Sequence, residues 1–274
     1  MDAGDLRVSV LVSKRREWLL RGFFRQWRKY GANLRLSLED WKHPKESVSA
    51  FQVDVVGFGA EPKNVLPFDA EFVSLGAQED YPAERWSNAL IKYLQSITTP
   101  VVCLMLEDYW LTRAVNTASF RDCFSMMTDN LDRTLRLDLT SDRVEGGKPT
   151  VEIGSRGTTD FIMSAPEASY NVSLQAALWN REKLLQILEP GETPWEFELL
   201  GTQRLNERLM RGEPFAVLGT RQWPVRYNGV MVRGKFDLDG SWQYPARQFS
   251  VEDATELMSG GYCDESETVR GRVS

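Results

Sequence analysis

Two neighbouring carboxylates follow an apolar run near the middle of this 274-residue sequence. The run is Val101–Leu106, and Glu107 and Asp108 come next, followed by Tyr109 and Trp110. A short, unbroken apolar run is typical of a strand that is buried on both faces of a parallel sheet. Because open α/β sheets bind ligands outside the carboxyl ends of their strands, we expect the two carboxylates at a ligand site.

The histidine and cysteine content limits the chemistry that these carboxylates can join. The single histidine, His43, precedes a proline and is expected in a loop, and the three cysteines are spread along the chain. Zinc sites and a Ser-His-Asp triad are therefore not expected. An oxygen-liganded Mg²⁺ or Mn²⁺ fits the pair, with Asp108 as the first ligand candidate and Glu107 as the second. A salt bridge at the strand end fits the spacing at least as well.

A second acidic pair, Glu196 and Glu198, follows Thr193 and Pro194. Threonine can cap a helix and proline favours its first position, so both glutamates fall in the first helical turn. The helix dipole stabilises carboxylates there, which is the plain explanation of the pair. The chemical alternative is a general base that accepts a proton from a substrate hydroxyl.

The elements that would position these groups follow an α/β pattern. The chain opens with a strand at Leu6–Val12, the basic turn Ser13–Arg16, a helix that ends at Gly31 and a second strand at Leu34–Leu38. Further strands are expected at 53–57, 72–76, 101–106 and 135–139, with strand-like sequence over 215–245, and further helices at 82–97, 116–131, 174–188 and from 194. We therefore predict an α/β fold with a mixed, mostly parallel sheet flanked by helices. Neither a Gly-x-Gly-x-x-Gly fingerprint nor a P-loop follows the first strand.

Charge and hydropathy limit the class of partner. The net charge is −6, so no overall basic field attracts nucleic acid, although basic residues are dense between Lys14 and Lys45. That cluster is either a solvated helix face or a phosphate-binding patch. The sequence has no twenty-residue apolar stretch and no signal-peptide pattern, so we expect a cytoplasmic protein without a transmembrane segment.

The order of these motifs resembles the GT-A glycosyltransferases, a Rossmann-like family that uses nucleotide-sugar donors. Leu106–Tyr109 stands in the place of the family's metal-binding acidic motif, and Trp195–Leu199 resembles its second acidic motif. The second Asp of the usual metal motif is absent. More narrowly, five segments resemble a poorly characterised bacterial and phage subgroup: 106–110, 136–143, 173–180, 194–198 and 219–221.

The resemblance implies an inverting transfer of a sugar from a nucleoside-diphosphate sugar to an acceptor hydroxyl. It implies Mn²⁺ or Mg²⁺ at Asp108, and Glu196 as the base with Glu198 in support. The expected donor-side residues are Ser13, Lys14, Asp54 and Arg85. Gln175 and Trp179, four residues apart on the helix expected at 174–188, could offer a sugar a hydrogen bond and a stacking plane, although core packing explains Trp179 slightly better.

The resemblance also implies a domain plan. A GT-A-like domain spans residues 1–245, with a donor nucleotide half at 1–110 and an acceptor and catalytic half at 111–245. Residues 246–274 are expected to be a polar, loosely held C-terminal tail. The glycine- and charge-rich segment 141–159 is either a lid or a surface hairpin.

Three readings of the function stay open at this point. The enzyme's acceptor is either a cell-envelope saccharide or a hydroxymethylated base in phage DNA. A non-catalytic relative that binds carbohydrate or nucleic acid is the alternative from another class. A nucleotidyltransferase is the third, but it would be expected to carry a glycine-rich loop where this chain has Ser13–Arg16.

Overall fold

The computed structural model describes residues 5–34, 50–67, 69–238 and 248–263. A nine-stranded sheet forms its centre, in the order β3-β2-β1-β4-β9-β6-β10-β8-β7. Strands β8 and β9 run opposite to the other seven. The predicted α/β class with a mostly parallel sheet is therefore confirmed.

The strands of the central sheet are short, and most are buried. Their bounds are β1 Asp5–Leu11, β2 Ala50–Gly57, β3 Ala70–Ser74, β4 Val101–Leu106, β6 Thr134–Asp138, β7 Thr150–Arg156, β8 Thr159–Ser164, β9 Ala177–Asn180 and β10 Ala216–Thr220. Two small antiparallel pairs lie beside this sheet: β5 Tyr109–Leu111 with β11 Tyr227–Gly229, and β12 Met231–Val232 with β13 Lys235–Phe236.

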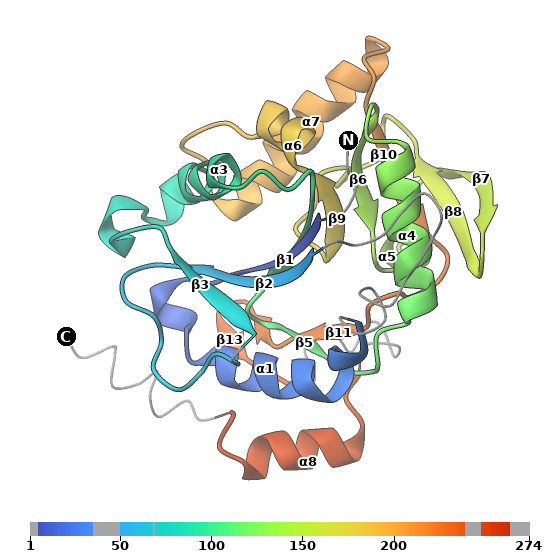
Figure 1. Ribbon diagram of the computed structural model, residues 1–274. Helices are drawn as coiled ribbons and strands as arrows, with labels where there is room; N and C mark the ends of the chain where they lie inside the picture. Colours follow the sequence, from blue (N-terminus) through green and yellow to red (C-terminus); the bar gives the residue numbers. More distant parts are fainter. Residues whose placement is uncertain (1–4, 35–49, 68, 239–247, 264–274) are drawn as a thin grey trace.

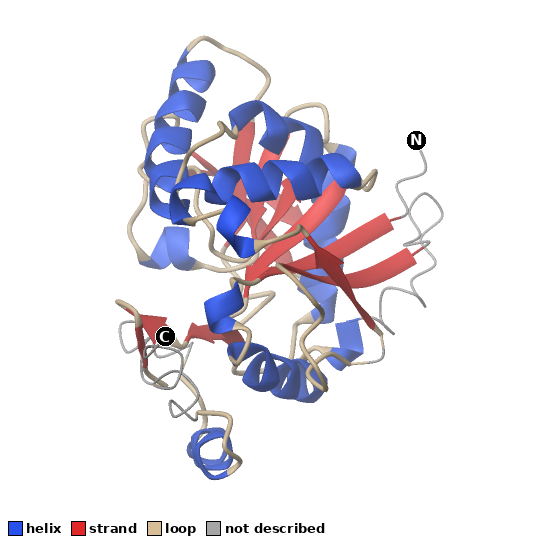
Figure 2. Cartoon of the chain, turned by 90° about the vertical axis from the view of Figure 1, so that its left-hand side faces the viewer, coloured by secondary structure: helices blue, strands red, loops and turns tan. Residues whose placement is uncertain are grey.

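Helices cover both faces of the sheet (Figures 1 and 2). On one face, α1 Leu19–Tyr30 and α4 Thr117–Asp129 pack against the sheet. On the other face lie α3 Trp86–Ser96, α6 Arg181–Ile187 and α7 Pro194–Met210. Strand β4 sends Cys103 and Met105 into the first core and Val102 and Leu104 into the second. Burial on both faces explains why β4 carries no charged or strongly polar residue. The remaining helices are α5 Asp142–Glu145 and α8 Val251–Ser259.

The strand order changes direction between β1 and β4. From β1 the chain adds β2 and β3 on one side, and β4 then pairs with the other side of β1. Such a reversal opens a crevice at the carboxyl ends of the two strands. Because β9 is antiparallel to β4 and β6, its first residue lies at the same edge as their last residues. This edge therefore gathers the loops after β1, β4 and β6 and the loop before β9.

The turn after β4 is fixed by Trp110, whose side chain is completely buried. Its indole Nε1 donates to the Glu107 carbonyl oxygen at 3.2 Å. The ring lies against α1 at Gly22, where an added Cβ would come within 2.1 Å of it. Only glycine allows this approach, so α1 and the turn that carries Glu107 and Asp108 pack as one unit.

Two elements differ from the sequence-based expectations. The helix expected over 174–188 is wrong for its first half, because residues 177–180 form β9 and the helix begins only at Arg181. The segment expected to be a loosely held tail contains α8, whose Asp253 accepts a hydrogen bond from Lys29 of α1 at 2.8 Å. Most of the strand expected at Leu34–Leu38, and His43, lie outside the described residues.

The glycine-rich segment 141–159 forms α5, β7 and the turn into β8, which is one helical turn followed by a hairpin (Figure 1). No helix in the described part of the chain is long and apolar enough to cross a membrane.

Candidate active site

The first part of the site is the crevice between the ends of β1 and β4. Ser13 occupies the N-cap position of the short 3₁₀ turn η1, Lys14–Arg16, which begins three residues after the end of β1. The Lys14 backbone N–H donates to Gln78 Oε1 at 3.0 Å, and the Lys14 ammonium pairs with Glu17. Arg16 Nη1 lies 3.5 Å from Glu107 Oε1 across the crevice. The structure therefore brings the predicted basic turn and the predicted acidic pair together.

Both carboxylates of the acidic pair are buried: Glu107 is 4% and Asp108 6% exposed. Burial raises the pKa of Glu107, and the neighbouring Asp108 raises it further, while Arg16 opposes the shift. Burial also raises the pKa of Asp108, opposed by Arg16 and by the Met231 backbone N–H. Asp108 Oδ1 has no hydrogen-bond partner among the described residues. A buried carboxylate oxygen is normally paired with a cation or a hydrogen-bond donor, and Asp108 Oδ1 has neither among the described residues.

Asp108 fits one coordination position of a divalent cation. Mg²⁺ and Mn²⁺ at a diphosphate need only one or two protein carboxylates, since water and phosphate oxygens complete the shell. The bare Oδ1 is the observation that supports this fit, whereas Glu107 is already engaged by Arg16. Within the described ranges, no three His, Cys, Asp or Glu side chains group into an all-protein metal site.

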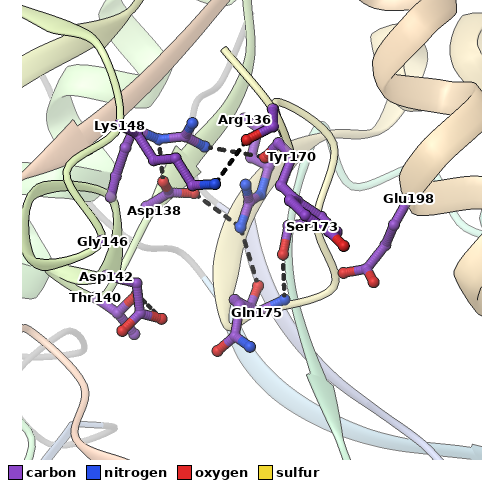
Figure 3. A pocket seen from close by; sticks show the side chains of 12 residues that line it. Arg136, Asp138, Thr140, Asp142, Gly146, Lys148, Tyr170, Ser173, Gln175 and Glu198 are labelled. Atoms are coloured by element: carbon purple, nitrogen blue, oxygen red, sulfur yellow. Dashed lines mark hydrogen bonds and ion pairs between the residues drawn. The ribbon is translucent and has the colours of Figure 1, made fainter. Parts of the chain in front are cut away.

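The second part of the site is a pocket of about 270 Å³ further along the same edge (Figure 3). It lies where β6 ends and β9 begins, and α5 and α7 also contribute to its wall. Twelve residues line it: Arg136, Asp138, Thr140, Asp142, Arg143, Gly146, Lys148, Ser169, Tyr170, Ser173, Gln175 and Glu198. Eleven of these carry a polar or charged side chain, which suits a hydroxyl-rich or charged ligand.

A buried ion-pair network holds the upper wall of the pocket. The Asp138 carboxylate lies 2.8 Å from Arg136 Nη2 through one oxygen and 2.8 Å from Arg143 Nε through the other. Arg143 also donates to Ser164 and Asn171, which lock its position. Burial lowers the pKa of the Arg136 guanidinium, and Asp138 counteracts this effect.

The two predicted base candidates lie in different environments. Glu196 is exposed and completes a capping box with Thr193: Glu196 N–H donates to Thr193 Oγ1, and Thr193 N–H donates to Glu196 Oε2. The Thr193 backbone N–H on the Glu196 carboxylate, together with a side-chain hydrogen bond from Thr193, lowers the pKa of Glu196. Glu198 lines the pocket, where Oε1 accepts the Leu174 N–H at 2.6 Å. Of the two, only Glu198 is placed to meet a bound substrate.

A polar link joins the two parts of the site. Tyr109, which follows Asp108, stacks on Tyr227 with ring centroids 4.3 Å apart. The Tyr227 hydroxyl hydrogen-bonds to the Gln175 amide oxygen, and Gln175 lines the pocket. The structure therefore places Gln175 where a substrate contact is possible, although it precedes a strand rather than lying on a helix.

Three predicted residues lie away from these groups. Trp179 is completely buried in β9, with Arg136 over its ring, and offers no free face for stacking on a sugar. Asp54 lies inside the sheet, where it pairs with Arg7 and accepts the Tyr93 hydroxyl, away from the crevice and the pocket. Arg85 is exposed in the turn before α3.

The pocket residues at the end of β6 were not singled out from the sequence. Asp138 and its two arginines belong to the 136–143 segment that carries part of the family resemblance. The family resemblance of that segment was the only feature of the sequence we considered that pointed to these three residues. Alternation along it predicted a strand and said nothing about a shared carboxylate, since Arg143 comes from a helical turn beyond the strand.

No protein-family model matches the chain, and no curated protein matches it. Solved structures do. Residues 1–349 of S. aureus TarS in complex with UDP-GlcNAc match 78% of this chain with 13% identity and a TM-score of 0.41. A nucleotidyl transferase from Methanothermobacter, Mth528, matches 80% of this chain and 88% of its own with 10% identity and a TM-score of 0.39.

A third match is CMP:2-keto-3-deoxy-manno-octonic acid synthetase complexed with CTP, with 10% identity, 79% of this chain covered and a TM-score of 0.38. The chain spans 55% of the TarS chain solved with UDP-GlcNAc. Similarity at this level assigns no activity to this chain.

Proposed function

We propose that this protein is a glycosyltransferase that moves a sugar from a nucleoside-diphosphate donor to an acceptor hydroxyl. The observation that carries the proposal is the arrangement at the sheet edge: a basic turn faces a buried carboxylate pair at the strand-order reversal. A polar pocket with a carboxylate lies further along the same edge. The first part suits a diphosphate with its cation, and the second suits a sugar and its acceptor.

The chain's own groups would divide the reaction as follows. Lys14 and Arg16 stabilise the negative charge that develops on the departing diphosphate as its bond to the sugar carbon breaks. Glu198 takes the proton of the acceptor hydroxyl while the oxygen forms its bond to the same carbon. Attack opposite to the leaving group inverts that carbon. Gln175, held by the Tyr227 hydroxyl, would orient the sugar.

A divalent cation would be held by Asp108 and by the donor phosphates. It would supply Lewis-acid stabilisation of the leaving group. Mn²⁺ and Mg²⁺ both prefer the oxygen ligands present there. Glu107 keeps Arg16 in the crevice and is the weaker ligand candidate, because its carboxylate is already paired.

A saccharide fits the acceptor better than DNA. Two cations of the basic segment, Arg25 and Lys29, are engaged by acidic side chains of α8, Glu256 and Asp253. These pairs reduce the charge that α1 can offer to a phosphate backbone. The part of the basic segment beyond Leu34 lies outside the described residues.

The test measures nucleoside diphosphate release from UDP-, GDP- and dTDP-sugars, and nucleoside monophosphate release from CMP-sugars. Each donor is incubated with Mn²⁺, Mg²⁺ or chelator. We expect release from one donor in the presence of metal and a loss of about 100-fold or more in Asp108→Asn. Asp132→Asn is the matched control, since Asp132 is exposed at the opposite end of β6.

Two outcomes would count against the enzyme. Equal turnover in Asp108→Asn and Asp132→Asn would remove Asp108 from the site. If no donor is turned over with a panel of saccharide acceptors present, and none shifts the melting temperature, the chain is better described as a non-catalytic binding module.

The placement of the two glutamates predicts how their variants differ. Glu198→Gln should reduce transfer by about 10²–10⁴-fold while donor binding persists, because a general base is lost. Glu196→Gln should leave the transfer rate unchanged and at most weaken the first turn of α7, because the Glu196 carboxylate serves the capping box. Parallel measurements of kcat and donor affinity separate the two. An active Glu198→Gln beside an inactive Glu196→Gln would reverse the assignment.

A further inference from the structure

The pocket holds more positive than negative charge in its buried wall. Arg136 and Arg143 are 1% and 5% exposed, and both guanidiniums share the single carboxylate of Asp138. One buried positive charge therefore has no buried carboxylate of its own in this network. An isolated buried charge is costly, so such a wall favours a counter-anion.

The Arg136 guanidinium also has unused donors. Its Nε and Nη1 are buried and have no hydrogen-bond partner among the described residues. Its Nη2 donates weakly to the Gln175 carbonyl at 3.4 Å, and the group lies 5.2 Å from the centre of the Trp179 ring. Buried arginine donors are usually satisfied, so the guanidinium is short of partners at the wall of the pocket.

A third cation comes from another part of the wall. The Lys148 ammonium donates to Ser169 Oγ at 2.6 Å and lies 5.3 Å from the centre of the Tyr170 ring. Figure 3 shows the lysine reaching across the pocket toward the side on which Arg136 and Asp138 lie. Arg136 and Lys148 thus both line this pocket, and side chains of these two kinds are common in sites that bind anions.

The other acidic groups of the pocket do not fill this region. Glu198 lies beyond Ser173 as seen from Arg136, and Asp142 lies beside Thr140 (Figure 3). Each already accepts a hydrogen bond, Glu198 from the Leu174 N–H and Asp142 from the Thr140 hydroxyl. Glu198 acts on the charge of Arg136 from a distance, but no hydrogen bond joins it to Arg136 or Lys148 in the described structure.

We propose that Arg136 and Lys148 bind one anionic group of the substrate, a carboxylate or a phosphate. The proposal rests on the proposed function, in which this pocket receives the sugar and its acceptor. It narrows the substrate class: either the transferred sugar or the acceptor carries a negative charge besides the donor diphosphate.

The test begins with small anions and needs no donor. Inorganic phosphate and acetate are titrated into the full chain, and binding is followed by calorimetry at fixed ionic strength. We expect saturable binding of at least one anion and a loss of about fivefold or more in affinity in Lys148→Gln. Lys148 is a partly exposed side chain near the molecular surface, so its replacement should leave the fold intact.

Two control variants locate the bound anion. Lys63→Gln removes an exposed lysine in the loop after β2 and should bind like the wild type. Arg16→Gln removes the cation of the β1–β4 crevice and should also retain the binding that Lys148→Gln loses. If Arg16→Gln loses the anion and Lys148→Gln keeps it, the binding belongs to the crevice and the proposal is wrong. No binding of either anion by the wild type would also overturn it.

Acceptors and donors in matched pairs then identify the source of the charge. Transfer is compared between neutral, carboxylate-bearing and phosphate-bearing forms, and the preference for one charged form should fall in Lys148→Gln. A transferase that uses neutral sugars and acceptors with unchanged efficiency would contradict this inference and leave the proposed function standing. Anion binding without transfer of any sugar would support this inference and contradict the proposed function.

Discussion

At the scale of single residues, the acidic pair that follows β4 lies at a candidate ligand site and yet is almost completely buried. A carboxylate with 6% exposure and one unpartnered oxygen destabilises the fold in which it sits. Such a cost is retained where a residue has a task, which is why strongly shifted pKa values gather at functional sites. At Asp108, the buried carboxylate lowers the stability of the fold, and the same carboxylate has an oxygen that could bind a cation.

The raised pKa values at Asp108 and Glu107 predict a pH dependence of stability. Between their ordinary values near 4 and their raised values, the folded chain holds protons that the unfolded chain releases. Folding stability should therefore fall as the pH rises through this interval. Asp108→Asn removes the share of that loss that belongs to Asp108, whose pKa is raised to about 6, so its gain in melting temperature over the wild type should grow from about pH 4 to about pH 6 and then level off.

Thermal melts of both proteins across this range test the prediction, with Asp132→Asn as the control. Melting curves that shift in parallel at every pH would show that Asp108 ionises without strain. Added Mn²⁺ should narrow the difference at the upper end, because a cation that binds only the folded wild type stabilises it.

At the scale of elements, the turn after β4 depends on how closely α1 approaches it. The Trp110 ring occupies the space that a side chain at position 22 would need, and its indole N–H holds the Glu107 carbonyl. The position of the acidic pair is therefore set partly by a glycine some 85 residues earlier in the chain. Sequence motifs around residue 107 alone do not reveal this dependence.

Gly22→Ala should destabilise the protein by about 1–3 kcal/mol, because the new methyl group displaces a fully buried indole. It should also lower donor turnover beyond its effect on stability, since the carbonyl of Glu107 moves with Trp110. Urea unfolding gives the first quantity and kinetics at a permissive temperature give the second. In the control Gly229→Ala, the nearest atom lies at 3.9 Å, and we expect a much smaller change. Equal effects at both positions would refute the packing argument.

At the scale of the whole molecule, α8 ties the C-terminal part of the described chain to α1. Asp253 is completely buried and accepts hydrogen bonds from Lys29 and Tyr30 of α1 and from Ser250. Burial raises the pKa of Asp253, but these hydrogen bonds outweigh it, and the net pKa is lowered. The contact therefore stabilises the fold at neutral pH and loses its effect as the pH falls below about 4.

Asp253→Ala should cost about 1–3 kcal/mol of unfolding free energy at neutral pH, because it leaves the Lys29 and Tyr30 groups without their acceptor. The difference from the wild type should shrink in acid. Glu252→Ala, one residue away and exposed, is the control and should change stability by less than about 0.5 kcal/mol. Urea unfolding at two pH values measures both. A free C-terminal segment would make the two variants indistinguishable.

Sequence patterns predicted most of the sheet, because β1, β4 and β6 carry strongly apolar or alternating runs that few other structures accommodate. They failed at β9, where four consecutive buried residues show no alternation and the leucines around them also fit a helix. They failed at α8, whose polar composition hides one buried leucine and specific partners on α1. Local spacing does not encode contacts made across two hundred residues.

In the candidate site, too, residues that follow a recognisable strand were predictable and residues that depend on long-range contacts were not. Asp108 and the basic turn were predictable because each ends a recognisable strand. Asp138 was not, because its importance comes from two arginines that converge on it only in the folded chain. Trp179 was misplaced for the same reason as β9, since a residue expected on a helix face lies instead inside the sheet.

The outermost strand β7 has a further consequence, for self-association. Its N–H and C=O groups on the side away from β8 form an edge that another chain can pair with, and Val151 and Ile153 are exposed on it. Two features oppose such pairing: the irregular register between Glu152 and Gly154, and the charged Glu152 itself. Replacing Glu152 with an apolar residue should allow β7 to pair with the β7 edge of another molecule. Light scattering at high protein concentration would detect the resulting aggregates.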